Sequence, residues 1–217
     1  MINSSLLLES LPQLLHGLWI SLQIALFSST IGILFGIFFG FVLAYKIPFL
    51  KLLVTVYVNI IRGTPMLIQI LFAFYFLPQL GFSIDAFWTA VIAIGLNSSA
   101  YISQIMRSGI QAIPQGQLEA AQVLGLSKID TIRFIILPQA LAIVLPSLGN
   151  EFVTLVKDSS LASIIGVTEL AKEGRIIISQ KFDAITIFVA MALLYLSVTL
   201  TISGAMHLFE KRMRKHA

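Results

Sequence analysis

Residues 119–125 read Glu-Ala-Ala-Gln-Val-Leu-Gly, and Leu137-Pro138-Gln139-Ala140 follow in the same part of the chain. The first stretch belongs to a polar island in an otherwise apolar sequence, and the island predicts two short helices. Gly125 is expected to end the first helix, because glycine readily adopts the left-handed conformation of a C-terminal cap. Residues 127–130, Ser-Lys-Ile-Asp, fit a capping box that begins the second helix. A polar, helix-forming island between apolar segments is well placed to dock a soluble partner.

The composition is that of a membrane protein. Of the 217 residues, 58% are hydrophobic and 11% are charged, and the mean hydropathy is +0.95. Soluble domains carry about 25% charged residues. Four runs without Asp, Glu, Lys or Arg reach the roughly 20 residues that cross a bilayer, and Glu151 interrupts a fifth. We therefore predict an all-α bundle of five transmembrane helices in one domain, residues 1–217, with spans at about 16–45, 51–77, 86–107, 133–156 and 184–209 and a polar loop at 108–132.

Several classes of function are excluded or disfavoured by composition. The absence of cysteine excludes disulfides and thiolate metal sites, and the three histidines lack the spacing of metal ligands, so we expect no metal. A net charge of +4 is low for a protein that binds nucleic acid. The cations instead lie beside the predicted spans.

The distribution of these cations predicts orientation. One side of the membrane would hold Lys46, Lys51, Arg107, Lys128, Arg133 and the basic tail at 211–215. The other side would hold an N-terminus without Lys or Arg, an uncharged loop at Pro78, and residues 157–183, a mixed loop whose cations are offset by acids. Because cytoplasmic loops are enriched in Lys and Arg, we expect an external N-terminus and a cytoplasmic C-terminus.

Glycine and proline mark where spans pack or bend. Gly32, Gly36 and Gly40 lie along one helical face, which predicts close helix packing. Gly63 and Pro65 should kink the second span. Pro138, with Pro146, should bend the fourth. Arg62, beside the first break, is either a gate or pairing partner, or a cation that extends to the membrane interface.

Polar residues inside two spans predict a substrate site. A charged side chain at the centre of a span costs roughly 2.5–3.5 kcal/mol and usually marks a pathway or a pair. In the fourth span Glu151, Thr154 and Asp158 share one helix face. In the third span Asn97 and Tyr101 share a face, with Ser98 beside it.

These two faces could bind one amino acid. Glu151 could bind a cationic group, and Asn97, Ser98 and Tyr101 could donate to a carboxylate. The alternatives are a structural ion pair of Glu151 with Arg62 or Lys157, and hydrogen bonding between helices for Asn97.

The polar island resembles the loop of the permease subunits of bacterial ATP-binding-cassette (ABC) importers. The resemblance rests on Glu119-Ala120-Ala121, Gly125, Ile135 and Leu137-Pro138 at the spacing of that family. Residues 61–65, 113–117, 137–140, 149–152 and 157–161 narrow it to the polar amino acid branch, of histidine, arginine or glutamine type. The resemblance implies a type I ABC importer permease fold in the cell inner membrane, with a cytoplasmic coupling helix. It also implies a dimer with an identical or paralogous permease, two ATPase subunits that bind ATP and Mg, and an extracytoplasmic solute-binding protein.

The chain itself is not expected to be an enzyme, because it contains no G-x-x-x-x-G-K-[ST] phosphate-binding motif. ATP would be hydrolysed by a partner, and Glu119, Ala120, Ala121 and Gly125 would transmit the movement. A solvated connecting helix is the alternative for this loop.

The leading hypothesis is a permease that imports a polar amino acid by alternating access. Glu151 points to a basic substrate and leaves a glutamine-type substrate open. The alternatives are an ion-coupled secondary amino acid carrier, which often shows internal repeats, and a non-transporting membrane scaffold, which would not require a charge such as Glu151.

Overall fold

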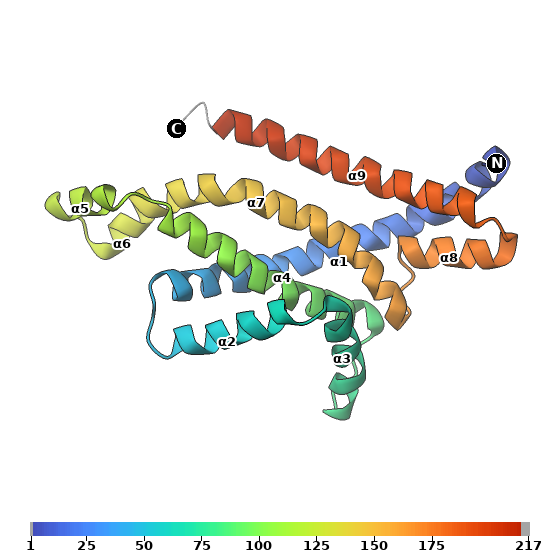
Figure 1. Ribbon diagram of the computed structural model, residues 1–217, viewed down its shortest axis with the longest axis horizontal. Helices are drawn as coiled ribbons and strands as arrows, with labels where there is room; N and C mark the ends of the chain where they lie inside the picture. Colours follow the sequence, from blue (N-terminus) through green and yellow to red (C-terminus); the bar gives the residue numbers. More distant parts are fainter. Residues whose placement is uncertain (1, 214–217) are drawn as a thin grey trace.

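Four long helices form an elongated bundle in the computed structural model, which describes residues 2–213 (Figure 1). They are α1 (Ser4–Ala44), α4 (Ala86–Gln111), α7 (Leu137–Asp158) and α9 (Ala184–Met213). Within the described residues, 4 helical segments are long and apolar enough to cross a membrane, or 5 if the bent pair α2 and α3 counts as one span. All regular elements in residues 2–213 are helical.

The tightest helix pair is α1 against α4, and glycine permits it. A Cβ atom at Gly32 or Gly36 of α1 would lie under 3.0 Å from Ser98 or Ile102 of α4. Small residues allow such a close approach of backbones in a membrane. The glycines of α1 therefore lie where the sequence predicted close packing.

The second predicted span is divided into two helices. α2 (Leu50–Gly63) runs beside the bundle, and α3 (Met66–Gln79) turns by 107° at the break between them (Figure 1). Proline lacks an N–H group, so Pro65 cannot donate to the carbonyl of Ile61 as the next helical turn would require. The expected kink in a span at residues 51–77 is in fact a turn of about a right angle.

The region expected as a mixed loop at residues 157–183 is largely helical. α7 continues to Asp158, and a 3₁₀ segment follows at Ser159–Ile165. Gly166 ends that segment with φ 97°, and α8 (Leu170–Lys181) packs against α1 and α9. Leu170 and Ile177 of α8 are buried, so an amphipathic pattern was present within the charged sequence.

The first helix also begins earlier than predicted. α1 starts at Ser4 rather than near His16, because Asn3 caps it with a side chain that accepts the N–H of Leu6. Glu9, which lies in this added part, is exposed and pairs with Lys181 at 2.6 Å.

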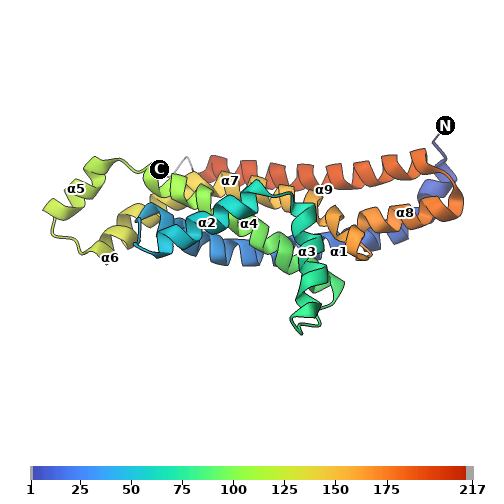
Figure 2. The ribbon, with the colours of Figure 1, turned by 60° about the horizontal axis from the view of Figure 1, so that its bottom comes forward.

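The polar island projects from one end of the bundle as α5 (Gln115–Val123) and α6 (Lys128–Asp130) (Figure 2). Gly125 has φ 72°, and the bonds Leu126 N–H to Ala121 O and Gly125 N–H to Gln122 O form a Schellman motif. Ser127 forms the expected N-terminal cap, because the Asp130 N–H donates to Ser127 Oγ.

The second short helix is not a separate element. α6 continues through a π-helical turn at Thr131–Ile136 into α7, so the fourth span begins within the island. The N–H of Leu137 bonds five residues back to Ile132, and Pro138 follows as the second residue of α7.

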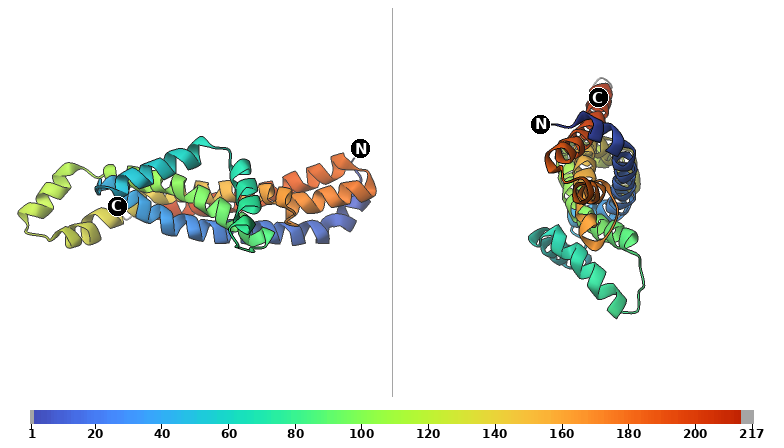
Figure 3. Two further views of the ribbon diagram at one scale, coloured as in Figure 1. Left: turned by 90° about the horizontal axis from the view of Figure 1, so that it is seen from below. Right: turned by 90° about the vertical axis from the view of Figure 1, so that its right-hand side faces the viewer.

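The two ends of the bundle carry different elements. α5, α6 and the last turns of α9 lie toward one end, and the start of α1 with α8 lies at the other (Figure 3). Residues 214–217, with part of the predicted basic tail, lie outside the described residues.

Candidate functional site

The two polar faces predicted from sequence meet in one cavity of about 360 Å³. Asn97 and Tyr101 reach it from α4, and Glu151, Thr154 and Asp158 reach it from α7. The break between α2 and α3 supplies the opposite wall. Its lining residues there are Thr64, Pro65 and Met66, and Leu155 and Leu161 complete the cavity.

Ser98 does not line this cavity, contrary to the prediction. It is fully buried between α1 and α4, where its hydroxyl lies against Gly32. Its Oγ donates to Glu151 Oε1 at 2.8 Å. Ser98 therefore contacts the Glu151 carboxylate from between α1 and α4.

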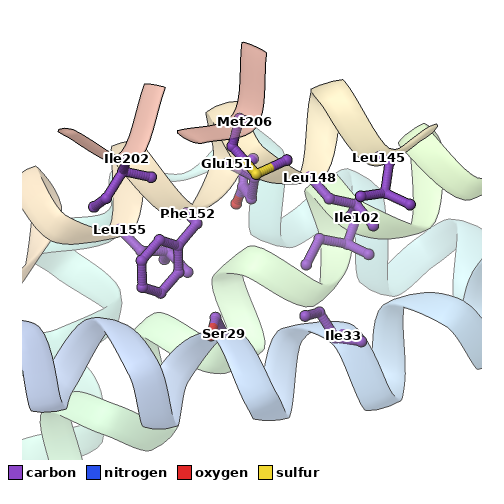
Figure 4. Close-up of a pocket in the computed structure, with 11 residues that line it drawn as sticks. Ser29, Ile33, Ile102, Leu145, Leu148, Glu151, Phe152, Leu155, Ile202 and Met206 are labelled. Atoms are coloured by element: carbon purple, nitrogen blue, oxygen red, sulfur yellow. The ribbon is translucent and has the colours of Figure 1, made fainter. Parts of the chain in front are cut away.

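Glu151 makes no ion pair with the side chains that the structure describes, so neither Arg62 nor Lys157 neutralises it there. It also borders a second, apolar cavity of about 280 Å³ between α1, α4, α7 and α9 (Figure 4). Leu148, Ile202 and Met206 are among the side chains around it there. The carboxylate thus separates a polar from an apolar cavity.

Arg62 packs on the cavity wall from outside. Its guanidinium lies 5.1 Å from the centre of the Tyr101 ring, a cation–π arrangement. Tyr101 in turn lines the cavity beside Pro65. The partner of the Arg62 guanidinium in the structure is thus an aromatic ring, not the carboxylate of Glu151.

Sequence reasoning missed Gln69 of α3. Its amide nitrogen donates to the carbonyls of Ile61 at 2.7 Å and Thr64 at 3.1 Å, and its oxygen accepts from Asn97 at 2.9 Å. The signal was available, because Gln69 is the one amide in the apolar run from Met66 to Leu77.

The loop residues predicted to couple to a partner differ in exposure. Glu119 and Ala120 are exposed on α5, whereas Ala121 is buried and shapes the cap of the helix. Three large apolar side chains that sequence reasoning did not single out are also highly exposed here: Val123 (88%), Leu124 (77%) and Ile129 (75%). Their apolar character within a polar island was the feature of the sequence that could have identified them.

A buried carboxylate lies at the opposite end of the bundle. Glu169 caps α8 by accepting the N–H groups of Ala171 and Lys172, and Ser21 of α1 and Tyr195 of α9 donate to it. Burial raises the pKa of Glu169, and these hydrogen bonds oppose the shift. Beyond the other end of α8, hydrogen bonds from Thr186 lower the pKa of the Asp183 carboxyl.

Comparison with known proteins decides the family. Residues 32–215 match the family described as the inner membrane component of binding-protein-dependent transport systems. The chain belongs to this family. Membership implies that it works with an ATPase, a binding protein and a second permease subunit.

Individual relatives agree over nearly the full length. The glutamine transport system permease protein GlnP of Escherichia coli strain K12 is 38% identical over 207 residues, which cover 94% of both chains. The arginine transport system permease protein ArtQ of Bacillus subtilis is 32% identical and covers 99% of both. A crystal structure of an amino acid ABC transporter with histidines matches with a TM-score of 0.91 at 37% identity, over 98% of this chain and 99% of that chain.

These matches confirm three predictions: the family, the all-α fold of a type I ABC importer permease, and a subunit that does not itself hydrolyse ATP. The chain is a multi-pass inner-membrane permease. An ion-coupled secondary carrier is not supported.

Proposed function

We propose that this permease forms the membrane pathway for a polar amino acid and favours one with a cationic side chain. The relatives are named for glutamine and arginine transport. The observation that carries the proposal is the cavity between α3, α4 and α7. Glu151 and Asp158 line it, and no Lys or Arg of the described residues does. Two carboxylates without a lining cation favour a ligand of positive charge.

The α5–α6 end of the bundle faces the cytoplasm in this proposal. Two partner ATPase subunits bind ATP and Mg there and contact Glu119, Ala120 and the exposed apolar residues that follow. Gly125 holds the sharp end of α5, and the continuous path from α6 into α7 carries movement toward Glu151. Pro65 and Pro138 lie at the breaks where helices reorient. The second permease is an identical or paralogous chain, and a solute-binding protein delivers substrate at the α8 end.

Transport by the reconstituted complex tests the proposal. Proteoliposomes that hold permease and ATPase, with binding protein outside and ATP inside, should accumulate L-arginine, and a variant ATPase that cannot hydrolyse ATP should abolish uptake. Uptake driven by a proton or sodium gradient without ATP would contradict the mechanism.

The two carboxylates should control selectivity. L-Citrulline has nearly the shape of L-arginine but carries no charge on its side chain. Glu151→Gln and Asp158→Asn should each reduce the preference for arginine over citrulline by about tenfold, the effect of one hydrogen bond to a charged group. Equal losses for both ligands would instead favour a structural role.

A further inference from the structure

The break between α2 and α3 leaves carbonyl groups without partners, and Gln69 supplies one of the missing donors. In a continuous helix the carbonyl of Ile61 would accept the N–H of residue 65, but residue 65 is proline. The Nε2 of Gln69 reaches back eight residues and donates to that carbonyl at 2.7 Å. The same nitrogen donates to Thr64 O at 3.1 Å and Thr64 Oγ1 at 2.7 Å. Gln69 thus replaces the proline's missing N–H.

These contacts fix which way round the Gln69 amide lies. Backbone carbonyls only accept hydrogen bonds, so the group that faces Ile61 and Thr64 must be the NH₂. The oxygen of Gln69 is then turned toward α4, where the Nδ2 of Asn97 donates to it at 2.9 Å. A reversed Asn97 would bring two amide oxygens together. The orientation of Asn97 therefore follows from the backbone at the break.

The carbonyl oxygen of Asn97 is left to face the cavity. Asn97 is only 6% exposed, and its Oδ1 has no hydrogen-bond partner within residues 2–213. Among the side chains that the structure describes, no buried oxygen or nitrogen lacks a partner. Oδ1 must therefore lie on open surface, and the open surface of Asn97 belongs to the cavity.

We propose that Gln69 is a positioning residue that turns the carbonyl oxygen of Asn97 into the cavity, so that the substrate meets an acceptor there. This proposal rests on the cavity being the substrate site. It reverses the role that sequence analysis assigned to Asn97, that of a donor to a carboxylate. Together with Glu151 and Asp158, the acceptor suits the cationic groups of a basic amino acid.

Binding of L-arginine and L-citrulline to the purified permease–ATPase complex tests the proposal. Asn97→Leu removes the acceptor and should lower the affinity for arginine about tenfold. Gln69→Met releases the Asn97 amide and should lower the arginine-to-citrulline preference about tenfold as well. Gln104→Met, at a half-buried position on α4 outside the cavity, is the matched control and should change neither affinity.

The outcomes separate this proposal from the proposed function. If the wild type binds neither ligand, or if Glu151→Gln leaves its preference unchanged, the assigned substrate site is wrong. If Glu151→Gln acts as expected while Asn97→Leu keeps the wild-type affinity for arginine, only the acceptor role is overturned. A Gln69→Met complex that melts at a lower temperature but keeps the wild-type preference would likewise show that Gln69 only supports the fold.

Discussion

At the scale of single residues, the central feature is a carboxylate placed in the membrane without a counter-ion in the described part of the chain. A hydroxyl from the neighbouring helix positions Glu151, and glycine makes room for that hydroxyl. Ser98 lies against Gly32 on one side and donates to Glu151 on the other. The position of the carboxylate thus depends on the packing of α1 against α4.

Ser98→Ala should weaken substrate binding without unfolding the protein. The change removes one hydrogen bond to a charged group, so we expect about tenfold lower affinity for L-arginine. Ser103→Ala is the control, because Ser103 is equally buried on α4 but bonds to the carbonyl of Ala100 in its own helix. Binding to the purified complex provides the measurement. Equal affinity in Ser98→Ala and wild type would contradict the positioning role.

The buried Glu169 should make stability depend on pH. Its pKa is raised above the ordinary 4.5. At pH values between 4.5 and the raised pKa, the folded protein therefore holds a proton that the unfolded chain releases. This contribution to stability is complete below about pH 4.5 and is lost as the pH rises through the raised pKa. The melting temperature of the wild-type complex, relative to Glu169→Gln, should therefore fall as the pH increases over that range.

Glu169→Gln itself provides the reference for this titration, because a glutamine side chain does not titrate. A wild-type advantage over Glu169→Gln that grows with pH would show that the hydrogen bonds at Glu169 outweigh its burial.

At the scale of elements, the sequence predicted the features that neighbouring residues determine. It did not predict those that depend on contacts between distant residues. Gly125 and Ser127 act on their own neighbours, and both caps form as predicted. α8 was missed because its charged residues resemble a loop, while the contacts that hold it come from Ser21 and Tyr195, far away in sequence. The sharpness of the α2–α3 turn depends on Gln69, which binds carbonyls five to eight residues away.

The α1–α4 contact yields a prediction about packing. Gly36→Leu should lower the melting temperature of the complex strongly, because a Cβ atom there already meets Ile102 at 2.5–2.6 Å and overpacking typically costs about 1–3 kcal/mol or more. Gly204→Leu is the matched control in α9, where a Cβ atom meets nothing within 4 Å. Thermal unfolding of both purified variants provides the test. Similar losses in the two would contradict close packing as the role of Gly36.

At the scale of the whole molecule, the sequence predicted most of the polar residues that line the cavity but not how they meet. Periodicity placed Asn97 and Tyr101 on one helix face and Glu151, Thr154 and Asp158 on another, and all five line the cavity. Ser98 was grouped with them because it is adjacent to Asn97 in sequence. Adjacent positions on a helix face different partners, and the packing of α1 against α4 decides that Ser98 is buried outside the cavity. The wall formed by Thr64 and Met66 depends on a turn whose angle the sequence did not specify.

The arrangement of charge along the bundle leads to a test of orientation. The cations Lys46, Lys51, Arg107, Lys128 and Arg133 belong to helix ends and connections at the α5–α6 end (Figure 1). Cytoplasmic loops are enriched in Lys and Arg, so we expect α8 to lie outside the cell.

Because the chain has no cysteine, single cysteines report position without background. Phe182→Cys, where the native side chain is 89% exposed beside α8, should react with a membrane-impermeant maleimide in intact spheroplasts. Lys51→Cys, exposed at the start of α2, should react only in inverted vesicles. The reverse pattern would place α5 and α6 outside the cell, where no ATP-hydrolysing partner could drive them.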